Sequence, residues 1–253
     1  MAVTPTSTVQ DSGLVAKLQP VPAADGLNMP VRQDKFGAIA PWCDAPTRHQ
    51  FAEEGSYLLA TNPTVGTGLT WVAAQTTFSD TTPNLYVFNN STTRSLYIDY
   101  LKLIATAAAT TAASIQYAIK TQSVPRVFTT DNTLAIVAVN PNQALPTLEN
   151  PIIKAQNSAT ASVMSASDSS ARLVGRGNLG GLNIAGTEML LTFGSTDAGV
   201  YVGQADAANQ PGRRGASCPP IIIGPGQALT FYLWMPSSAA SFNPEFELGM
   251  WAR

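Results

Sequence analysis

Alternation of apolar and polar residues is the main structural signal in this chain, and it is confined to the part beyond residue 54. Ile115, Tyr117 and Ile119 share one face of a segment whose other face is polar or small. Residues 245–250 alternate in the same way, with Phe, Leu and Met opposing two glutamates. A period of two with one polar face is typical of a half-buried antiparallel strand. We therefore expect Ile115 and Ile119 to be almost fully buried.

The segment Leu229–Met235 has a different pattern, because both of its faces are apolar. Phe231 and Leu233 lie on one face, and Tyr232 and Trp234 lie on the other. A strand of this kind is covered on both sides. We expect Phe231 and Leu233 to be buried against a second sheet, and the other face to be covered by the N-terminal segment or by another subunit.

The same patterns predict a series of short strands separated by turn residues. The stretch Asn150–Ser170 is polar and rich in Ser and Ala, so we expect an exposed loop there. We expect Ala105–Ala113 to be strand ends joined by a connection of small residues. The predicted strands are Ser56–Ala60, Leu69–Phe78, Leu85–Asn89, Ser95–Ala105, Ser114–Thr121, Leu134–Val139, Ala171–Arg176, Met189–Phe193, Val200–Gln204, Ile221–Ile223, Gln227–Met235 and Glu245–Ala252.

Residues 1–54 differ from the rest of the chain. Six prolines interrupt them, which removes backbone donors and predicts an extended arm, with one short helix over Pro46–Glu54. A disordered tail is the simpler interpretation. The apolar residues of the arm favour instead a strap that becomes ordered on a neighbouring subunit: Leu14, Val15, Leu18, Leu27, Met29, Val31, Phe36, Ile39 and Trp42.

Many short strands, few helices and turns rich in Pro and Gly predict an all-β protein, an antiparallel β-sandwich. Its size favours a jelly-roll-like sandwich with extra strands, because immunoglobulin-type domains run near 100 residues. The predicted organisation is an extended N-terminal arm at residues 1–54 and a β-sandwich domain at residues 55–253.

Charge narrows the possible partners. Only 12% of the 253 residues are charged and the net charge is −2, against about 25% charged residues in an ordinary soluble domain. No basic excess is present to displace counterions from phosphates, so we expect no nucleic-acid partner. Low charge also favours a chain whose surface is covered in an assembly, although it is common in secreted β-proteins too.

The N-terminus has neither the basic region nor the apolar stretch of a signal peptide, and no run approaches the roughly 18 apolar residues that span a bilayer. We therefore expect synthesis in a cytoplasm and no membrane partner. Cys43 and Cys218 are far apart in the sequence and form no metal-binding spacing. With His49 as the single histidine, we expect no metal and two free thiols, a long-range disulfide being the alternative.

A dinucleotide fingerprint, GxGxxG, occurs at Gly175–Gly180. That motif binds phosphates only when a helix begins at its end, and no helical pattern follows here. We therefore interpret it as a glycine-rich hairpin connection and expect no nucleotide cofactor. The pair Arg213–Arg214 is too small for a nucleic-acid patch, so we expect a loop tip, an interface contact being the alternative. Asn89 and Asn90 begin glycosylation sequons, which we interpret as turn residues.

No catalytic constellation stands out, and we predict no catalytic residues. A serine triad would depend on His49 in the proline-rich arm, and no nucleophile-elbow motif is present. A glycosidase needs two carboxylates. The available candidates are Glu245 and Glu247 on one strand face, and Asp197 and Asp206 in loops. Glutamates on a strand face are usually solvated or paired with a cation on the next strand.

The C-terminal residues Pro219–Trp234 and Phe246–Trp251 resemble the closing strands of jelly-roll virion proteins. They are similar to the capsid-associated decoration or cement proteins of tailed bacteriophages. The resemblance covers roughly the last 40 residues. It implies a homo-oligomer, with a trimer favoured, that binds a major capsid protein or other virion proteins. It supplies no functional residue.

Three functional hypotheses follow. The first is a non-enzymatic structural protein of the virion, assembled in the host cytoplasm, that reinforces a phage capsid through intersubunit contacts. The second is a receptor- or glycan-binding module of a phage fibre or tail, with Tyr201 or Trp71 able to stack on a sugar, although such aromatics more often belong to the core. The third is a hydrolase, which ranks last because a general base is lacking.

Overall fold

The computed structural model describes residues 47–71, 75–106, 114–144, 147, 149–167, 169–181, 185–194, 213–236 and 243–253. The chain divides into two units, Met1–Gln50 and Phe51–Arg253, and the sheets belong to the second.

The predicted short helix is confirmed as α2, Thr47–Glu53. Within the described ranges, no helix has the length and apolar character needed to cross a membrane. The predicted arm up to residue 46 and the predicted strand Val200–Gln204 lie outside the described residues.

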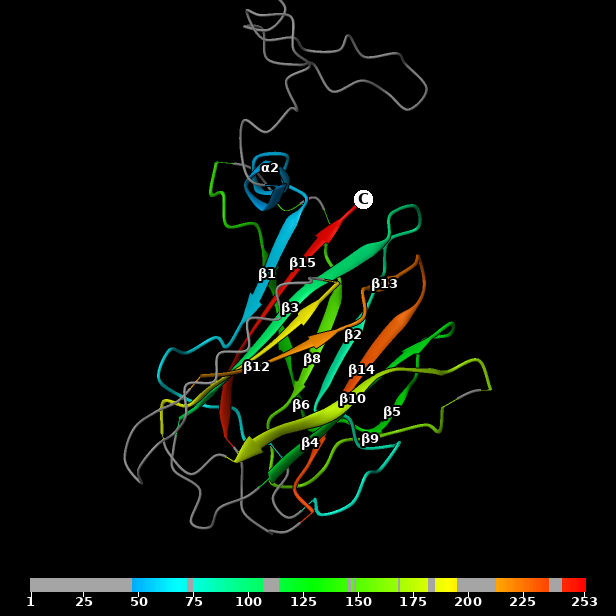
Figure 1. Cartoon of the computed structure of the whole chain (residues 1–253). Coiled ribbons are helices and arrows are strands. Elements are labelled where there is room, and N and C mark those ends of the chain that lie inside the picture. Colours follow the sequence, from blue (N-terminus) through cyan, green and yellow to red (C-terminus); the bar gives the residue numbers. More distant parts are fainter. Residues whose placement is uncertain are drawn as a thin grey trace, which may run out of the picture. The chain divides into compact units, whose positions relative to one another are not determined.

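The larger sheet of the second unit has seven strands (Figure 1). Six of them follow the order β12-β11-β3-β15-β1-β7, and β13 pairs with β3 beside them. All pairs are antiparallel except β11 with β12, which run parallel. The bounds are β1 Tyr57–Thr61, β3 Leu96–Ala105, β7 Ala138–Val139, β11 Glu188–Phe193, β12 Arg213–Cys218, β13 Ile221–Ile223 and β15 Pro244–Ala252.

The second sheet has six strands in the order β10-β4-β14-β2-β8-β6, and a two-stranded sheet pairs β5 with β9. All of these pairs are antiparallel. The bounds are β2 Leu85–Phe88, β4 Ser114–Gln122, β5 Phe128–Thr130, β6 Thr133–Ile136, β8 Ile152–Gln156, β9 Val163–Met164, β10 Arg172–Gly181 and β14 Ala228–Trp234.

The two large sheets enclose one hydrophobic core, to which both contribute alternate residues. From the six-stranded sheet, Ile115, Ile119 and Phe231 are each at most 1% exposed. From the seven-stranded sheet, Leu248 and Met250 are buried to the same degree. The predicted all-β sandwich and its alternating core strands are therefore confirmed, whereas the jelly-roll order of the strands stays a prediction.

Strand β14 is covered on both faces, as its apolar pattern predicts, but the predicted cover for the outer face is wrong. The ring of Phe78 packs edge-on against Tyr232 and Trp234, with ring centroids 5.2 and 5.5 Å apart. Phe78 belongs to residues 75–84 of the same chain, which we call the 75–84 loop. Neither the arm nor a second subunit is needed to cover Tyr232.

The predicted strand Leu134–Val139 is in fact two strands in different sheets. Ile136 ends β6 in the six-stranded sheet, and Ala138 begins β7 in the seven-stranded sheet. Val137 between them is 72% exposed, whereas both neighbours are buried. The chain therefore crosses from one sheet to the other at Val137, as strands do at the corners of sandwiches.

Two predictions about loops and strands are wrong. The described residues of Leu69–Phe78 do not form the predicted strand. Isolated backbone hydrogen bonds hold them instead of a continuous ladder: Leu69 N donates to the carbonyl oxygen of Pro244, and Met235 N donates to that of Gln75. Conversely, Asn150–Ser170 contains β8, an interior strand between β2 and β6. Its core face is short, only Ile153 and Ala155, which gives a weak sequence signal.

The glycine-rich motif is not a hairpin connection, because Gly175–Gly180 lies within the long strand β10. Nor is Arg213–Arg214 a loop tip, since these residues begin β12. Strand β10 pairs with β4 through two register irregularities. Its glycines leave room for large side chains of β4, because a Cβ at Gly177 would come within 2.8 Å of the Tyr117 ring. The glycines of this motif therefore have a packing role within β10.

Candidate functional site

The outer face of the six-stranded sheet, away from the core, carries the clearest concentration of functional groups. Strands β10, β4 and β14 set its floor by their register. Trp234 pairs with Gln116, and Tyr232 pairs with Ala118. Arg176 on β10 also pairs with Ala118. Because directly paired residues point to the same side of a sheet, all five side chains are outer-face residues.

The 75–84 loop crosses this outer face and supplies a second aromatic ring. Phe78 is 41% exposed, although it packs against Tyr232 and Trp234. Gln75 closes the loop internally, since its Nε2 donates to Thr82 Oγ1 at 2.9 Å. The loop therefore presents Phe78 beside Trp234 on a fixed base.

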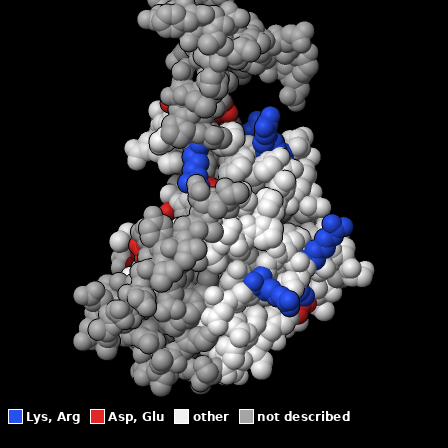
Figure 2. All heavy atoms as spheres, viewed as in Figure 1, with Lys and Arg blue, Asp and Glu red and all other residues white. Residues whose placement is uncertain are grey.

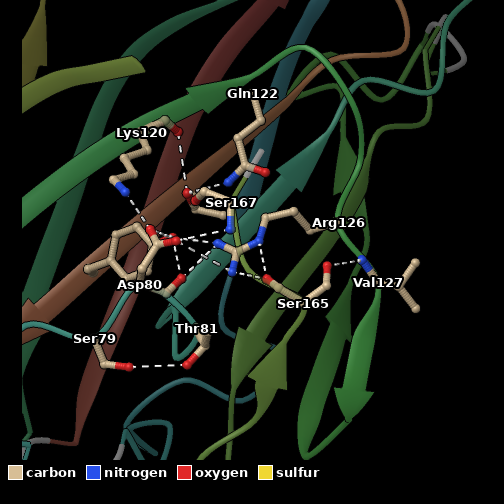
Figure 3. Close-up of polar contacts among 11 residues, drawn as sticks. Ser79, Asp80, Thr81, Lys120, Gln122, Arg126, Val127, Ser165 and Ser167 are labelled. Carbon is tan, nitrogen blue, oxygen red and sulfur yellow. Dashed lines mark hydrogen bonds and ion pairs between the residues drawn. The ribbon is translucent and has the colours of Figure 1, made fainter. Parts of the chain in front are cut away.

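A buried arginine holds the 75–84 loop against the sheet (Figure 3). The guanidinium of Arg126 donates through Nη1 to the carbonyl oxygen of Asp80 at 2.7 Å and to the Tyr232 hydroxyl at 2.8 Å. Its Nε donates to the carbonyl oxygen of Ser165 at 2.6 Å. The Arg126 side chain is only 3% exposed. One cation thus joins three segments that are distant in the sequence.

The carboxylate of Asp80 completes the cluster. Lys120 Nζ donates to its Oδ1 at 2.5 Å, and the Ser167 amide donates to its Oδ2 at 3.0 Å. Burial raises the pKa of Asp80, but these hydrogen bonds outweigh it and lower the pKa from 3.8 to about 2. Asp80 is therefore ionised at neutral pH, and its charge is balanced by Lys120 and by Arg126 Nη2 at 3.9 Å.

This ion cluster has the chemistry of a clamp rather than of a catalytic centre. A general base at neutral pH needs a pKa near 7, and Asp80 is shifted in the opposite direction. Burial also raises the pKa of the Tyr232 hydroxyl, which keeps it neutral. Among the described residues no three His, Cys, Asp or Glu side chains are grouped to hold a metal ion. The cluster fixes the loop and, with it, Phe78.

Beside the clamp lies a groove of about 560 Å³ on the same outer face. Trp234 and Phe78 line one side, and Leu173 on the edge strand β10 lines the other. Ala118 lies in the floor, where its small side chain leaves the hollow between larger neighbours. Lys120 also lines the groove, with its Nζ 5.5 Å from the centroid of the Phe78 ring.

The polar lining of the groove comes from adjacent strands. Gln116 on β4 and Asn178 on β10 are paired residues, and both line it. Arg176 lines it as well, is exposed, and makes no ion pair with another described residue. Lys120 is ion-paired with Asp80. Arg176 is therefore the cation in this groove whose charged group has no carboxylate partner among the described residues. An apolar wall facing amides and one cation is typical of a small-ligand site.

The structure brings no catalytic pair of carboxylates together among the described residues. Glu247 lies opposite Lys102 on β3, and their charged groups are 2.7 Å apart. The Tyr100 hydroxyl also donates to Glu247. This cross-strand ion pair confirms the structural interpretation of Glu247, and Glu245 lies two residues away on the same face. Asp197 and Asp206 lie outside the described residues.

The other candidate residues have structural surroundings. Trp71 is 1% exposed, so it belongs to the core and cannot stack on a sugar. Asn89 is buried in a turn, where its Nδ2 donates to the carbonyl oxygens of Arg94 and Ile223. Cys218 is a buried free thiol. His49 is exposed on α2. Tyr201 and Cys43 lie outside the described residues.

Sequence reasoning missed Asp80, Phe78 and Arg126, because they come from segments that are joined only in the folded chain. The residue of this site that the sequence pattern could indicate was Trp234, an apolar residue on the outer face of a strand. No protein-family model, curated protein or solved structure matches this chain.

Proposed function

We propose that this chain is a non-enzymatic structural protein of a bacteriophage virion. It assembles as a homo-oligomer, with a trimer favoured, and reinforces the capsid by binding the major capsid protein and neighbouring subunits. Its place is the assembled particle, built in the host cytoplasm, and its mechanism is mechanical. The work is done by apolar and main-chain contacts that are spread over several subunits.

The observation that supports this proposal is an apolar row on the outer face of the seven-stranded sheet. Ile222, Tyr97, Trp251 and Tyr57 are paired in register across four adjacent strands. Phe51 and Tyr97 both stack on Trp251, with their ring centroids 5.4 and 5.5 Å from that of the tryptophan. We call these five residues the apolar row. The row is continuous across these strands, although Tyr57 at one end is buried.

Part of the apolar row is open to solvent. Ile222 is 52% exposed, and Trp251 and Tyr97 are half-buried. Figure 2 shows few charged side chains on the described surface of the face it presents. Water contact with an apolar surface is unfavourable by about 25 cal/mol per Å², so association with a second subunit stabilises such a row. Sparse surface charge leaves little electrostatic repulsion against that association.

The test is the mass of the full chain in solution, measured by light scattering and by native mass spectrometry. We expect a homo-oligomer at micromolar concentration. The variant Ile222→Lys should shift the mass towards that of the monomer, because it places a charge in the apolar row. Val65→Lys is the matched control, since Val65 is 92% exposed on a loop and outside the row. A wild-type monomer that turns over a substrate overturns the proposal.

The virion role needs a second measurement, because an oligomer alone is not a capsid protein. Sequencing the DNA on both sides of the gene should reveal reading frames for a capsid, portal or scaffold protein. Deletion of residues 1–46 tests the strap while leaving α2 and the Phe51–Trp251 stack intact. We expect a folded sandwich that no longer assembles. A deletion variant that assembles like the wild type contradicts the predicted role of the arm.

A further inference from the structure

We propose that the groove on the outer face of the six-stranded sheet binds a saccharide that carries a carboxylate. The groove is formed by Phe78, Trp234 and Leu173 together with Gln116 and Arg176. This binding site is independent of the proposed structural role, because it lies on the sheet opposite the apolar row. It adds a recognition function to the chain.

The aromatic wall provides the surface on which a sugar ring can stack. Phe78 and Trp234 have ring centroids 5.5 Å apart and an interplanar angle of 64°. Phe78 is 41% exposed, and Trp234 is half-buried. One face of a pyranose ring carries mainly C–H bonds, which pack against the negative face of an aromatic ring. Both rings line the groove, so each can contact such a ligand.

The position of the aromatic wall is fixed before any ligand binds. Arg126 and Asp80 hold the 75–84 loop, which carries Phe78, through hydrogen bonds to the sheet and to residue 165. Trp234 is on a central strand between β4 and β2. A preformed wall lowers the entropy loss on binding, which matters most for sugars because their individual contacts are weak.

The polar groups opposite the aromatic wall match hydroxyl and carboxylate groups. The amide of Gln116 is both donor and acceptor, as is each sugar hydroxyl. Arg176 offers the planar fork of donors that binds a carboxylate through two parallel hydrogen bonds. Lys120 is held in its ion pair with Asp80, whereas Arg176 is exposed and makes no ion pair with another described residue, so its donors are open to a ligand. This charge favours an acidic sugar over a neutral one.

The first experiment screens the labelled full chain on a glycan array that contains neutral, sialylated and uronic-acid saccharides. Solution titrations then use 3′-sialyllactose as the acidic probe and lactose as the neutral one, with Trp fluorescence and NMR as readouts. We expect acidic saccharides to bind and neutral ones to bind at least about tenfold more weakly, since a hydrogen bond to a charged group contributes about 1.5–3 kcal/mol.

Two variants distinguish this site from nonspecific attraction. Arg176→Gln should weaken binding of the acidic probe by about tenfold or more. Arg172→Gln is the matched control, because Arg172 is exposed on the same strand but does not line the groove. Both arginines are exposed, so neither variant endangers the fold. Trp234→Ala should abolish binding of either probe, with circular dichroism as the check on folding.

Three outcomes overturn the proposal. The first is a glycan array without any bound acidic saccharide. The second is an equal effect of Arg176→Gln and Arg172→Gln, which would mean attraction to surface charge alone. The third is binding of an extended peptide along the edge strand β10 in place of a sugar. It would be detected as NMR shifts of the β10 amides that appear on addition of the peptide and not on addition of the sugar. None of these outcomes depends on the oligomeric state.

Discussion

Gly177 on β10 lies directly opposite Tyr117 on β4, and the tyrosine ring occupies the space that a side chain at residue 177 would need. A Cβ atom at Gly177 would come within 2.8 Å of Tyr117 Cε1 and 3.0 Å of its hydroxyl oxygen. The Tyr117 ring cannot move freely, because it stacks on Phe231 and its hydroxyl contacts Cys218 Sγ at 3.4 Å. The glycine therefore lets the edge strand close over a large core residue.

This relationship predicts the effect of an alanine at residue 177. Gly177→Ala should lower the free energy of unfolding by about 1–3 kcal/mol, because the added methyl group displaces the Tyr117 ring. Gly175→Ala is the matched control, since its Cβ would meet Ile119 Cδ1 at the longer distance of 3.2 Å. Urea denaturation of both variants measures the difference. Equal losses for the two variants would contradict the packing explanation.

The parts of the fold that the sequence predicts are those with local signals. Strands β4 and β15 were predictable because apolar and polar residues alternate within each segment, and β14 was predictable because its segment is apolar on both faces. Strand β8 was not, since only Ile153 and Ala155 carry its core face. The sheet crossing at Val137 was also not predictable, because partner choice for β6 and β7 depends on strands elsewhere in the chain.

The candidate site was less predictable than the fold, for a related reason. Trp234 was identifiable as an outer-face residue from the strand pattern alone. Its neighbours Phe78 and Arg126 were not, because no periodicity relates a loop residue to a strand from another part of the chain. The hollow itself depends on Ala118, a small residue whose importance is visible only beside Trp234 and Arg176.

Phe231 is the core residue for which we expect the largest single loss of stability. It is 1% exposed and stacks on Tyr117 at 6.2 Å between ring centroids. Truncation removes buried area and leaves a cavity, so Phe231→Ala should cost about 3–5 kcal/mol. Val65→Ala is a control at an exposed loop position outside the apolar row and should cost less than about 1 kcal/mol. A measured loss below about 1 kcal/mol for Phe231→Ala would show that the core assignment is wrong.

Arg126 links the stability of the fold to the shape of the groove. Replacement by Met keeps much of the side-chain volume but removes the donors to Asp80, Ser165 and Tyr232. Hydrogen bonds from a charged group contribute about 1.5–3 kcal/mol, so Arg126→Met should destabilise the fold by at least that amount. Hydrogen exchange followed by mass spectrometry should show faster exchange in the 75–84 loop. Arg94→Met is the control. If the 75–84 loop of Arg126→Met exchanged as slowly as that of the wild type, Arg126 would not hold the loop.

Asp80 makes the stability of the chain sensitive to acid. Its pKa is about 2 in the folded chain against 3.8 ordinarily, so the unfolded chain binds the proton more tightly. The stabilisation by the Asp80 carboxylate is therefore fully present above about pH 4 and is lost as the pH falls towards about 2. Urea denaturation between about pH 5 and pH 2 should show a steeper loss for the wild type than for Asp80→Asn.

A comparison with Asp131 separates the clamp from general acid sensitivity. Burial raises the pKa of Asp131, but hydrogen bonds from Lys154 and Thr133 lower it overall. Its side chain is 40% exposed, so solvent screens the ion pair with Lys154. Asp131→Asn should therefore change the acid dependence less than Asp80→Asn does. If the free energy of unfolding of the two variants depended on pH in the same way, Asp80 would contribute no more to acid sensitivity than an exposed ion pair.

Cys218 should be chemically protected in the folded chain. It is 4% exposed, and burial raises the pKa of its thiol, so little of the reactive thiolate is present at neutral pH. In a Cys43→Ser background, where Cys218 is the single thiol, Ellman's reagent should react slowly with the native chain and completely after unfolding in urea.

The rate at which Cys218 reacts should then follow local opening of the β11–β12 edge, because Cys218 ends β12 and pairs with Phe193. Gly177→Ala, which displaces the Tyr117 ring beside Cys218, should accelerate the native reaction more than Gly175→Ala. Fast stoichiometric labelling of the native Cys43→Ser chain would show that this edge of the sandwich is open.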